Sequence, residues 1–342
     1  MKILITGGCG FVGSNLGFYL KKKLQKTKIY SIDNLYRKGS KINETRLKKI
    51  GIKNFKIDIS NYKSFKKLPV ADLIIDCCAE PSIEVSKVDM DRVINTNFLG
   101  TYNILKKCIL DKANIIFLSS SRVYSISKIR SLVKEQTLKK KINLKYMINE
   151  KFDTFGVKSI YGLTKLASEQ LIREINFSHG IKYLINRFGV ISGPWQFGKQ
   201  DQGFVALWVA RHLNKKKLSY RGFGGNGHQS RDIIHIDDVC DIIFKQISRL
   251  KSINNKVFNI GGGRKNNISL RELTSLCEKT TGNKVKISKV RETSNYDIPF
   301  FVTDNSKIKK TYNWVPKKNI RTIINDISIW IKNNKQILNF FK

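Results

Sequence analysis

Tyr161 and Lys165 have the residue types and the spacing of an acid/base pair. They stand four residues apart in the run Tyr161-Gly162-Leu163-Thr164-Lys165, so a helix would place both side chains on one face. A free tyrosine has a pKa of about 10 and is a poor base at neutral pH, and a fixed cation beside it would stabilise its phenolate. The pair therefore predicts proton transfer at a hydroxyl group, although this spacing also arises by chance on helix surfaces.

A run of serines supplies a third candidate group. Ser119, Ser120 and Ser121 end an apolar segment that has the pattern of a strand. Ligands of open parallel sheets bind at the carboxyl edge of the strands. A serine hydroxyl at that edge could hydrogen-bond the reacting oxygen.

A glycine-rich turn predicts the site of a cofactor. Glycine permits a tight turn and lets the backbone approach a pyrophosphate, which then sits on a helix N-terminus where free N–H groups favour anions. The turn joins the first predicted strand to the first predicted helix and reads Thr6-Gly7-Gly8-Cys9-Gly10-Phe11-Val12-Gly13.

Asp33 completes this pattern, because it lies 20 residues past Gly13 at the end of the second predicted strand. There its carboxylate would accept hydrogen bonds from the adenosine ribose hydroxyls and repel a 2′-phosphate. We therefore expect NAD rather than NADP, while Arg37, a nearby guanidinium, could pair with such a phosphate. Asp58 and Ile59 are expected to end the third strand and to meet adenine, unless Asp58 is an ordinary strand-terminal aspartate.

Short β-rich runs alternate with helical patterns in the first half of the chain, which predicts an α/β fold with a Rossmann-type, doubly wound parallel sheet and a smaller C-terminal substrate-binding lobe. The predicted strands are 2–6, 28–33, 54–58, 72–77, 114–119 and 182–187, and the predicted helices are 11–23, 90–110 and 160–179; later come a helix at 269–281, a short strand near 285–290 and a helix from about 320 to 332. We expect 1–187 with about 232–262 to bind the dinucleotide, and about 188–231 with 263–342 to form the lobe.

Composition limits the partners and the compartment. The 342 residues are 41% apolar, enough for a sizeable core. The net charge of +38 comes from basic residues spread along the whole chain, so we interpret it as a bias carried on solvated faces, with only nonspecific adsorption to polyanions at low salt. Six cysteines without metal-like spacing predict reduced thiols and no metal site. No signal peptide or membrane span is evident, so we expect a cytoplasmic protein with no nucleic-acid or membrane partner.

Together these motifs resemble the extended short-chain dehydrogenase/reductase family over essentially the whole length. The resemblance rests on TGGCGFVG, Asp33, the run Asn97 to Thr101, the serines before Val123-Tyr124, YGLTK, and the run Arg231 to Asp238. It implies NAD as cofactor, Ser120 as the hydroxyl partner of Tyr161 and Lys165, and Asn97 as a support of the active site. It further implies that Arg231 and Arg291 contact the diphosphate of a sugar nucleotide, and that helices 90–110 and 160–179 form a homodimer.

Within that family the chain is most similar to the CDP-paratose 2-epimerase branch, which acts in CDP-tyvelose formation for polysaccharide biosynthesis. The shared loops are the runs Asp33 to Gly39, Gly193 to Gly198, Asp201 to Gly203 and Gly225 to Asp232. Where many relatives have His-x-Ala-Ala/Gly-Gln, this chain reads Asp76-Cys77-Cys78-Ala79-Glu80, so Glu80 could tune substrate choice or form a salt bridge with the local excess of lysines. Asp76 needs a partner that the sequence does not identify.

Three groups of site residues follow. The expected catalytic group is Ser120, Tyr161 and Lys165; the cofactor group is Gly7, Gly10, Phe11, Val12, Gly13, Asp33, Asn34, Arg37, Asp58, Ile59, Ala79, Asn97, Tyr161 and Lys165; the substrate group is Glu80, Ser121, Gln196, Gln202, Arg231 and Arg291. We expect epimerisation of a nucleotide sugar, CDP-hexose favoured, by transient oxidation. A UDP- or dTDP-sugar 4-epimerase stays open. A dehydratase is disfavoured, because Ser121 and Arg122 stand where such relatives have Asp-Glu. From another class, a noncatalytic, RNA-associated NAD-binding protein would not need Ser120, Tyr161 and Lys165.

Overall fold

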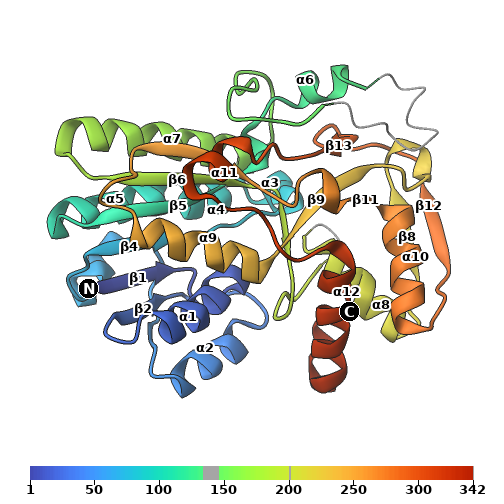
Figure 1. The fold of residues 1–342 in the computed structure, drawn as a ribbon, viewed down its shortest axis with the longest axis horizontal. Helices are drawn as coiled ribbons and strands as arrows, with labels where there is room; N and C mark the ends of the chain where they lie inside the picture. Colours follow the sequence, from blue (N-terminus) through green and yellow to red (C-terminus); the bar gives the residue numbers. More distant parts are fainter. Residues whose placement is uncertain (134–145, 200–201, 342) are drawn as a thin grey trace. The chain divides into compact units, whose positions relative to one another are not determined.

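Seven short strands form one sheet in the order β10-β6-β5-β4-β1-β2-β3 (Figure 1). The pairs β1 with β2, β1 with β4, β2 with β3 and β4 with β5 are parallel. The strands are β1 Lys2–Thr6, β2 Lys28–Ile32, β3 Lys53–Phe55, β4 Leu73–Asp76, β5 Asn114–Ser120, β6 Tyr183–Phe188 and β10 Lys256–Ile260. The predicted Rossmann-type α/β fold is confirmed, and the six expected strands are joined by β10 at the edge.

The computed structural model describes residues 1–133, 146–199 and 202–341. The chain divides into two compact units. Unit 1 comprises Met1–Val123, Ser159–Arg187 and Cys240–Phe258, and unit 2 comprises Tyr124–Lys158, Phe188–Val239 and Asn259–Lys342. Unit 2 thus takes in residues 124–158, 232–239 and 259–262, all of which were expected in the dinucleotide-binding part.

The sheet of unit 1 has a buried face of aliphatic side chains. Leu4, Ile74 and Ile115 of the sheet pack with Leu105 and Ile172, which lie outside it, in one core cluster. Ile3 and Ile5, which are also buried, alternate with Leu4 along β1 and so point to the opposite face. Strands buried on both faces explain why the runs read as continuous apolar segments.

Helices surround this sheet. Those that begin in unit 1 are α1 Phe11–Lys23, α2 Ser40–Lys49, α3 Ile83–Val88, α4 Met90–Ile94, α5 Gly100–Asp111 and α7 Ile160–His179, while α9 Ile236–Ser248 extends into it from unit 2. Figure 1 shows α7 along the upper side of this unit and α1 and α2 along its lower side. The predicted bounds of α1 and α7 are confirmed. For α7 the Ser159 hydroxyl accepts the Gly162 N–H, and Gly180 ends the helix with a left-handed backbone.

Two predicted elements differ from the structure by more than two residues. The single helix expected over 90–110 consists of α4, a π-helical turn at Asn95–Leu99 and α5. The third strand ends at Phe55 rather than at Asp58. The Asp58 carboxylate instead accepts the N–H and the hydroxyl of Ser60, and such local hydrogen bonding competes with strand pairing.

Unit 2 is built around β9 Ser230–His235, which pairs in parallel with β7 Val190–Ser192 and β13 Phe300–Phe301 and antiparallel with β11 Asn267–Ser269. The other strands and helices are β8 Leu218–Arg221, β12 Ile287–Val290, α6 Ile126–Ser131, α8 Phe204–Leu213, α10 Leu270–Thr281, α11 Ser306–Tyr312 and α12 Ile320–Asn333. The helices α8, α10 and α12 contact one another (Figure 1). Their apolar faces form a second core cluster that includes Trp208, Leu273 and Ile327.

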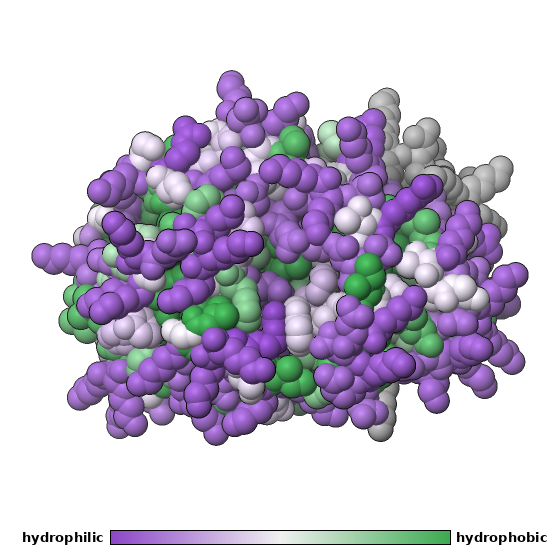
Figure 2. All heavy atoms as spheres, turned by 60° about the horizontal axis from the view of Figure 1, so that its bottom comes forward, coloured by the Kyte–Doolittle hydropathy of each residue, from purple (hydrophilic) through white to green (hydrophobic). Residues whose placement is uncertain are grey.

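Hydrophilic side chains cover most of the face shown in Figure 2. No helix in the described part of the chain is long and apolar enough to cross a membrane. Within the same residues, no group of three or more His, Cys, Asp or Glu side chains could hold a metal ion. All six cysteines, each of which is described, are free thiols.

Candidate active site

Lys165 is a charged side chain held out of water inside unit 1. It is 1% exposed, its ammonium donates to the Cys78 carbonyl oxygen over 3.3 Å, and it lies 4.4 Å from the centre of the Phe117 ring. An ammonium has three N–H donors, and burying a charge is costly unless it is well paired. The position therefore suits further hydrogen bonds from Lys165 to a bound ligand.

Tyr161 and Ser120 lie on elements that pack together. Tyr161 is the second residue of α7, one turn before Lys165. The helix α7 packs against β5, whose last residue is Ser120, and against the turn Ser121–Val123 that follows. The Ser120 hydroxyl oxygen accepts the N–H of Arg122 over 3.1 Å, which leaves its own hydrogen for another acceptor. All three expected catalytic residues thus belong to one edge of unit 1.

A buried ion pair that was not predicted from the sequence anchors α7. Glu169 is fully buried, and its carboxylate accepts hydrogen bonds from Arg187 Nε at 3.0 Å and from Arg187 Nη2 at 2.6 Å. The Ser119 hydroxyl donates to the same carboxylate over 2.5 Å. Tyr161, Lys165 and Glu169 recur at intervals of four residues, and this spacing on a helix was the signal that could have identified Glu169.

Asn97 connects several segments around the site. It lies in the π-helical turn, where its side chain accepts the Glu80 N–H over 2.8 Å and donates to the Glu80 carbonyl over 3.0 Å. It also donates to the hydroxyl of Thr164, and its own carbonyl accepts the hydroxyl of Ser168. Asn97 thereby fixes the segment after β4 against α7, a position that π-helical turns often occupy near functional sites.

The glycine turn has the form that a pyrophosphate requires. Gly7 has a φ of 59°, and a Cβ on Gly13 would lie 2.3 Å from the Gly7 carbonyl oxygen. The helix α1 begins at Phe11 with no side chain capping its first turn, so the N–H groups there, including that of Val12, point outward without intrahelical partners. Such a helix start favours an anion.

Asp33 follows β2 directly and is tied to this turn. One carboxylate oxygen accepts the Cys9 N–H over 3.1 Å and the other accepts the Leu35 N–H over 2.8 Å. Burial raises the pKa of Asp33, while those two N–H groups and Arg37 act in the opposite direction. With the glycine turn and the buried Lys165, the residues present fit a dinucleotide.

Asn34 and Asp58 lie together beside Asp33. The amide of Asn34 donates to the Asp58 carboxylate over 2.8 Å. Ile59 is buried, and its side chain lies within 2.5 Å of where a Cβ on Gly100 would stand. Asp58 therefore lies in the loop after β3, where it accepts the amide of Asn34 next to Asp33.

The two acidic residues that the sequence left unexplained have partners. Asp76 is fully buried and accepts the Thr6 hydroxyl at 2.6 Å, the Thr101 hydroxyl at 3.1 Å and the Cys78 N–H at 3.1 Å. The Glu80 carboxylate pairs with arginines rather than with lysines. Ala79 lies between Cys78 and Glu80, and so between the carbonyl that binds Lys165 and the backbone that Asn97 holds.

Of the expected substrate residues, four lie in unit 2. Arg231 donates to the carbonyl oxygens of Ser230 and Ile298, each over 2.8 Å, and Arg291 is exposed just after β12. The Gln196 amide is engaged in its own loop by the Ser192 hydroxyl and the Ile191 carbonyl. The Gln202 N–H donates to the Lys199 carbonyl. The other two lie in unit 1: Ser121 starts the turn after β5, and Glu80 lies in the segment after β4.

Known proteins resemble this chain over most of its length. The model of the NAD dependent epimerase/dehydratase family matches residues 3–261. The CDP-paratose 2-epimerase of Salmonella typhi is 30% identical over 345 residues, which cover 96% of this chain and 99% of that protein.

Two solved structures share the fold. A UDP-glucose 4-epimerase of Thermotoga maritima with UDP-glucose superposes with a TM-score of 0.83 at 23% identity, covering 98% of this chain and 100% of that one. A UDP-glucuronic acid 4-epimerase of Bacillus cereus, in complex with UDP-glucuronic acid and NAD, has a TM-score of 0.81 at 24% identity with the same coverage.

Proposed function

The chain belongs to the NAD dependent epimerase/dehydratase family, and from that premise we propose that it epimerises a nucleotide-diphosphate sugar by transient oxidation to a keto sugar. The observation that carries the proposal is the buried ammonium of Lys165, one helical turn from Tyr161 and with a single carbonyl acceptor among the described residues. Burying a cation costs free energy, so Lys165 would be unfavourable at this edge of the sheet if the helix had only a structural role.

The chain's own residues perform the proton chemistry. The Tyr161 phenolate, stabilised by the Lys165 ammonium, takes the proton from a sugar hydroxyl, and the Ser120 hydroxyl donates a hydrogen bond to the same sugar oxygen as it becomes a carbonyl. When bound, NAD accepts the hydride from the sugar carbon and later returns it. Tyr161 then gives the proton back, so no redox equivalent is consumed.

Inversion requires that the keto sugar turns over while the nucleotide stays bound. We assign this anchoring to Arg231 and Arg291, whose guanidinium groups can pair with a diphosphate. The carbonyl oxygens of Ser230 and Ile298 orient the Arg231 guanidinium. The glycine turn and Asp33 would hold the dinucleotide throughout the cycle.

For the substrate we propose a CDP-hexose, inverted as in a CDP-paratose 2-epimerase. The 30% identity to the Salmonella typhi protein over nearly the whole of both chains supports this choice. A UDP-sugar 4-epimerase is the second candidate, favoured by the similarity of the fold to two UDP-sugar 4-epimerases. Dehydration is disfavoured because Ser121 and Arg122 supply no carboxylic acid after Ser120.

We also propose a cytoplasmic homodimer that forms through α4, α5 and α7. Leu163 is 51% exposed and Phe177 is 88% exposed on α7, and Tyr102 of α5 is 42% exposed, so these helices present apolar side chains that a second copy could cover. Light scattering on the purified chain tests this assembly, and a monomer at micromolar concentration would contradict it.

The test of the proposed function uses a panel of CDP-, UDP- and dTDP-hexoses with NMR of the sugar ring. We expect inversion of one CDP-hexose with no net change in NAD. The Tyr161→Phe variant should lose turnover by about 10³-fold or more, because the proton acceptor is gone, and should still bind NAD. Tyr62→Phe, at a partly exposed tyrosine beside Phe65, is the matched control and should keep full activity. An unchanged rate in Tyr161→Phe would refute the proposal.

A further inference from the structure

Charged groups of unit 1 gather around Glu80, whose side chain is largely buried. Its residue is 5% exposed. One carboxylate oxygen accepts Arg37 Nη2 at 2.8 Å and the other accepts Arg92 Nη2 at 2.6 Å, while the Ser82 N–H donates over 3.3 Å. Charge-assisted hydrogen bonds of this length are strong, and a buried carboxylate tolerates its position only with such partners.

The groups around Glu80 are themselves fixed. The backbone of Glu80 is held on both sides by the Asn97 amide. The Arg92 guanidinium lies 3.8 Å from the centre of the Tyr36 ring and donates to the Tyr36 hydroxyl over 2.6 Å. These contacts join three parts of unit 1. They are the segment after β2, which holds Tyr36 and Arg37, the segment after β4, which holds Glu80, and the helix α4, which holds Arg92.

Arg37 lies between two carboxylates. It follows Asp33 by four residues and is close enough to oppose the rise in the pKa of Asp33, and it forms an ion pair with Glu80. A guanidinium in this position, next to the carboxylate that would bind the adenosine ribose, could receive a 2′-phosphate. In this chain that guanidinium forms an ion pair with the Glu80 carboxylate instead.

We propose that Glu80 is a specificity-determining residue, which favours binding of NAD over NADP by engaging the Arg37 guanidinium. This inference rests on the proposed function, because it requires a dinucleotide seated on the glycine turn. A 2′-phosphate would have to compete with Glu80 for Arg37 and would meet the repulsion of the Asp33 carboxylate. NAD, which has a hydroxyl at that position, meets neither obstacle.

Glu80→Gln tests the inference, because it keeps the shape of the side chain and one acceptor oxygen but removes the charge. The whole chain, as wild type and as variant, is titrated with NAD and with NADP, and the dinucleotide released on denaturation is identified by chromatography. We expect the ratio of the NADP Kd to the NAD Kd to fall by about tenfold, through tighter NADP binding. Glu84→Gln removes the charge of an exposed glutamate that pairs with Lys87 at 2.9 Å, and should leave the ratio unchanged.

Arg37→Ala distinguishes an effect of breaking the Arg37–Glu80 ion pair from an effect of removing a negative charge. Added to Glu80→Gln, it should abolish the gain in NADP binding, and alone it should produce no gain. A folded Glu80→Gln variant with the wild-type ratio overturns the inference, as does a gain that persists without Arg37. If Glu80→Gln does not fold, Glu80→Asp, whose shorter carboxylate retracts from Arg37, is measured against the same criterion. A wild-type chain that binds neither dinucleotide refutes the proposed function instead.

Discussion

Lys165 carries a positive charge that the fold has removed from water, and other buried ionisable groups of unit 1 gather at the same edge. Asp76, Glu80 and Glu169 are each at most 5% exposed, and each accepts at least three hydrogen bonds. Fully paired groups of this kind are rigid, because any movement would leave a buried charge without its hydrogen-bond partners. The edge is therefore built to hold its donors and acceptors in fixed places before a ligand arrives.

His235, the last residue of β9 in unit 2, has a different consequence for pH. It is 1% exposed, its Nδ1 accepts the Asp237 N–H over 3.0 Å, and its Nε2 lies 3.4 Å from Asp326. Burial lowers the pKa of His235 to about 4, helped by Lys318 and opposed by Asp237 and Asp326. The unfolded chain, where the pKa is near its ordinary 6.5, therefore takes up the proton first as the pH falls.

The contribution of His235 to the free energy of unfolding is therefore fully present above about pH 6.5. It is lost as the pH falls toward about 4, and the total loss is about 3 kcal/mol. Melting temperatures at about pH 7.5 and about pH 5 measure the loss. His235→Gln should be less stable at the higher pH and should show a smaller drop between the two. The exposed His179→Gln is the control; an equal drop in all three proteins would contradict the prediction.

At the scale of the residue, the sequence could identify Tyr161, Lys165, Ser120 and Asp33 as candidates because their spacing is local or linked to a strand end. It could not identify the partners of Asp76. Thr6 stands 70 positions away and Thr101 stands 25 positions away, and the two meet Asp76 only because β1 lies beside β4 and α5 packs on β4. Long-range pairing of this sort has no signal in one sequence.

At the scale of the element, α7 is the part of the site whose position matters most. The helix carries Tyr161 and Lys165 in its first turns, and the buried pair of Glu169 with Arg187 of β6 fixes its middle. Because the same carboxylate also accepts the Ser119 hydroxyl, the pair ties α7 to the strand that ends in Ser120. The anchor therefore sets the distance between the helix and the serine.

Glu169→Gln should destabilise the protein by about 3 to 5 kcal/mol, since it leaves the buried guanidinium of Arg187 without its counter-charge. Urea unfolding measures the effect. Glu174→Gln on the exposed side of the same helix should change the free energy of unfolding by less than about 0.5 kcal/mol. A loss below about 1 kcal/mol in Glu169→Gln would contradict the anchoring role.

Whether an element was predictable depended on its ends. The bounds of α1 and α7 agree with the sequence because a glycine turn precedes the first and a serine cap and a glycine enclose the second. The break at Asn95–Leu99 was not foreseen, since the residues of that turn have no helix-breaking type and its π-helical form depends on what Asn97 binds elsewhere in the fold. The strands of unit 2 are short and pair over long sequence distances, which periodicity does not reveal.

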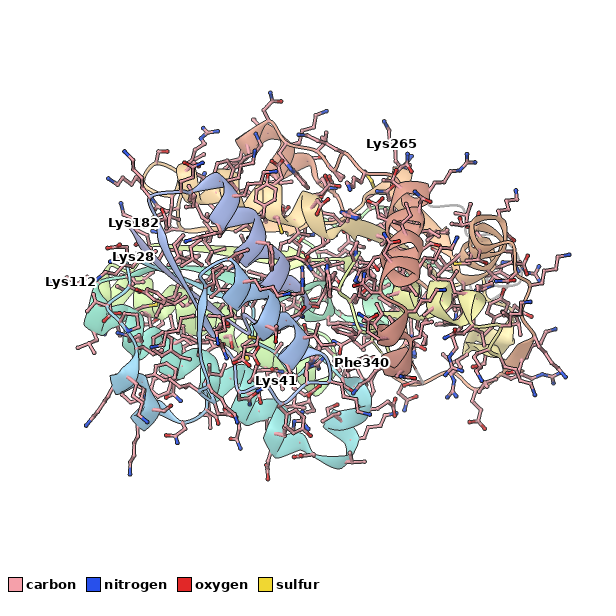
Figure 3. The ribbon with its side chains drawn as sticks, turned by 90° about the horizontal axis from the view of Figure 1, so that it is seen from below. Lys28, Lys41, Lys112, Lys182, Lys265 and Phe340 are labelled. Atoms are coloured by element: carbon pink, nitrogen blue, oxygen red, sulfur yellow. The ribbon has the colours of Figure 1, made fainter. Side chains whose placement is uncertain are left out.

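At the scale of the whole molecule, the charge of +38 is the dominant property. Within unit 1, Lys28 begins β2, and Lys112 and Lys182 precede β5 and β6, so all three mark the amino edge of the sheet, opposite to the edge that holds Asp33 and Ser120. Figure 3 shows these lysines at the same end of the unit. A polyanion bound at these three lysines would lie at the edge of the sheet opposite to Asp33 and Ser120.

We therefore expect the protein to bind heparin or duplex RNA at about 50 mM salt and to release both by about 200 mM, with log K falling linearly with log salt. Turnover should be the same with and without the polyanion at the lower salt. Filter binding and the NMR assay measure the two quantities. Retention of one RNA sequence at about 200 mM salt would instead favour the noncatalytic, RNA-associated alternative.

The π-helical turn at Asn95–Leu99 has one more consequence, for the lengths that this segment can tolerate. A turn of this kind holds one residue more than a regular α-helical turn. Deleting a single amino acid there would restore an uninterrupted helix with better local geometry, yet it would rotate one flank relative to the other by about 100°. Asn97 would then face away from Glu80 and Ser168, so the shorter, more regular chain would be the one that misassembles.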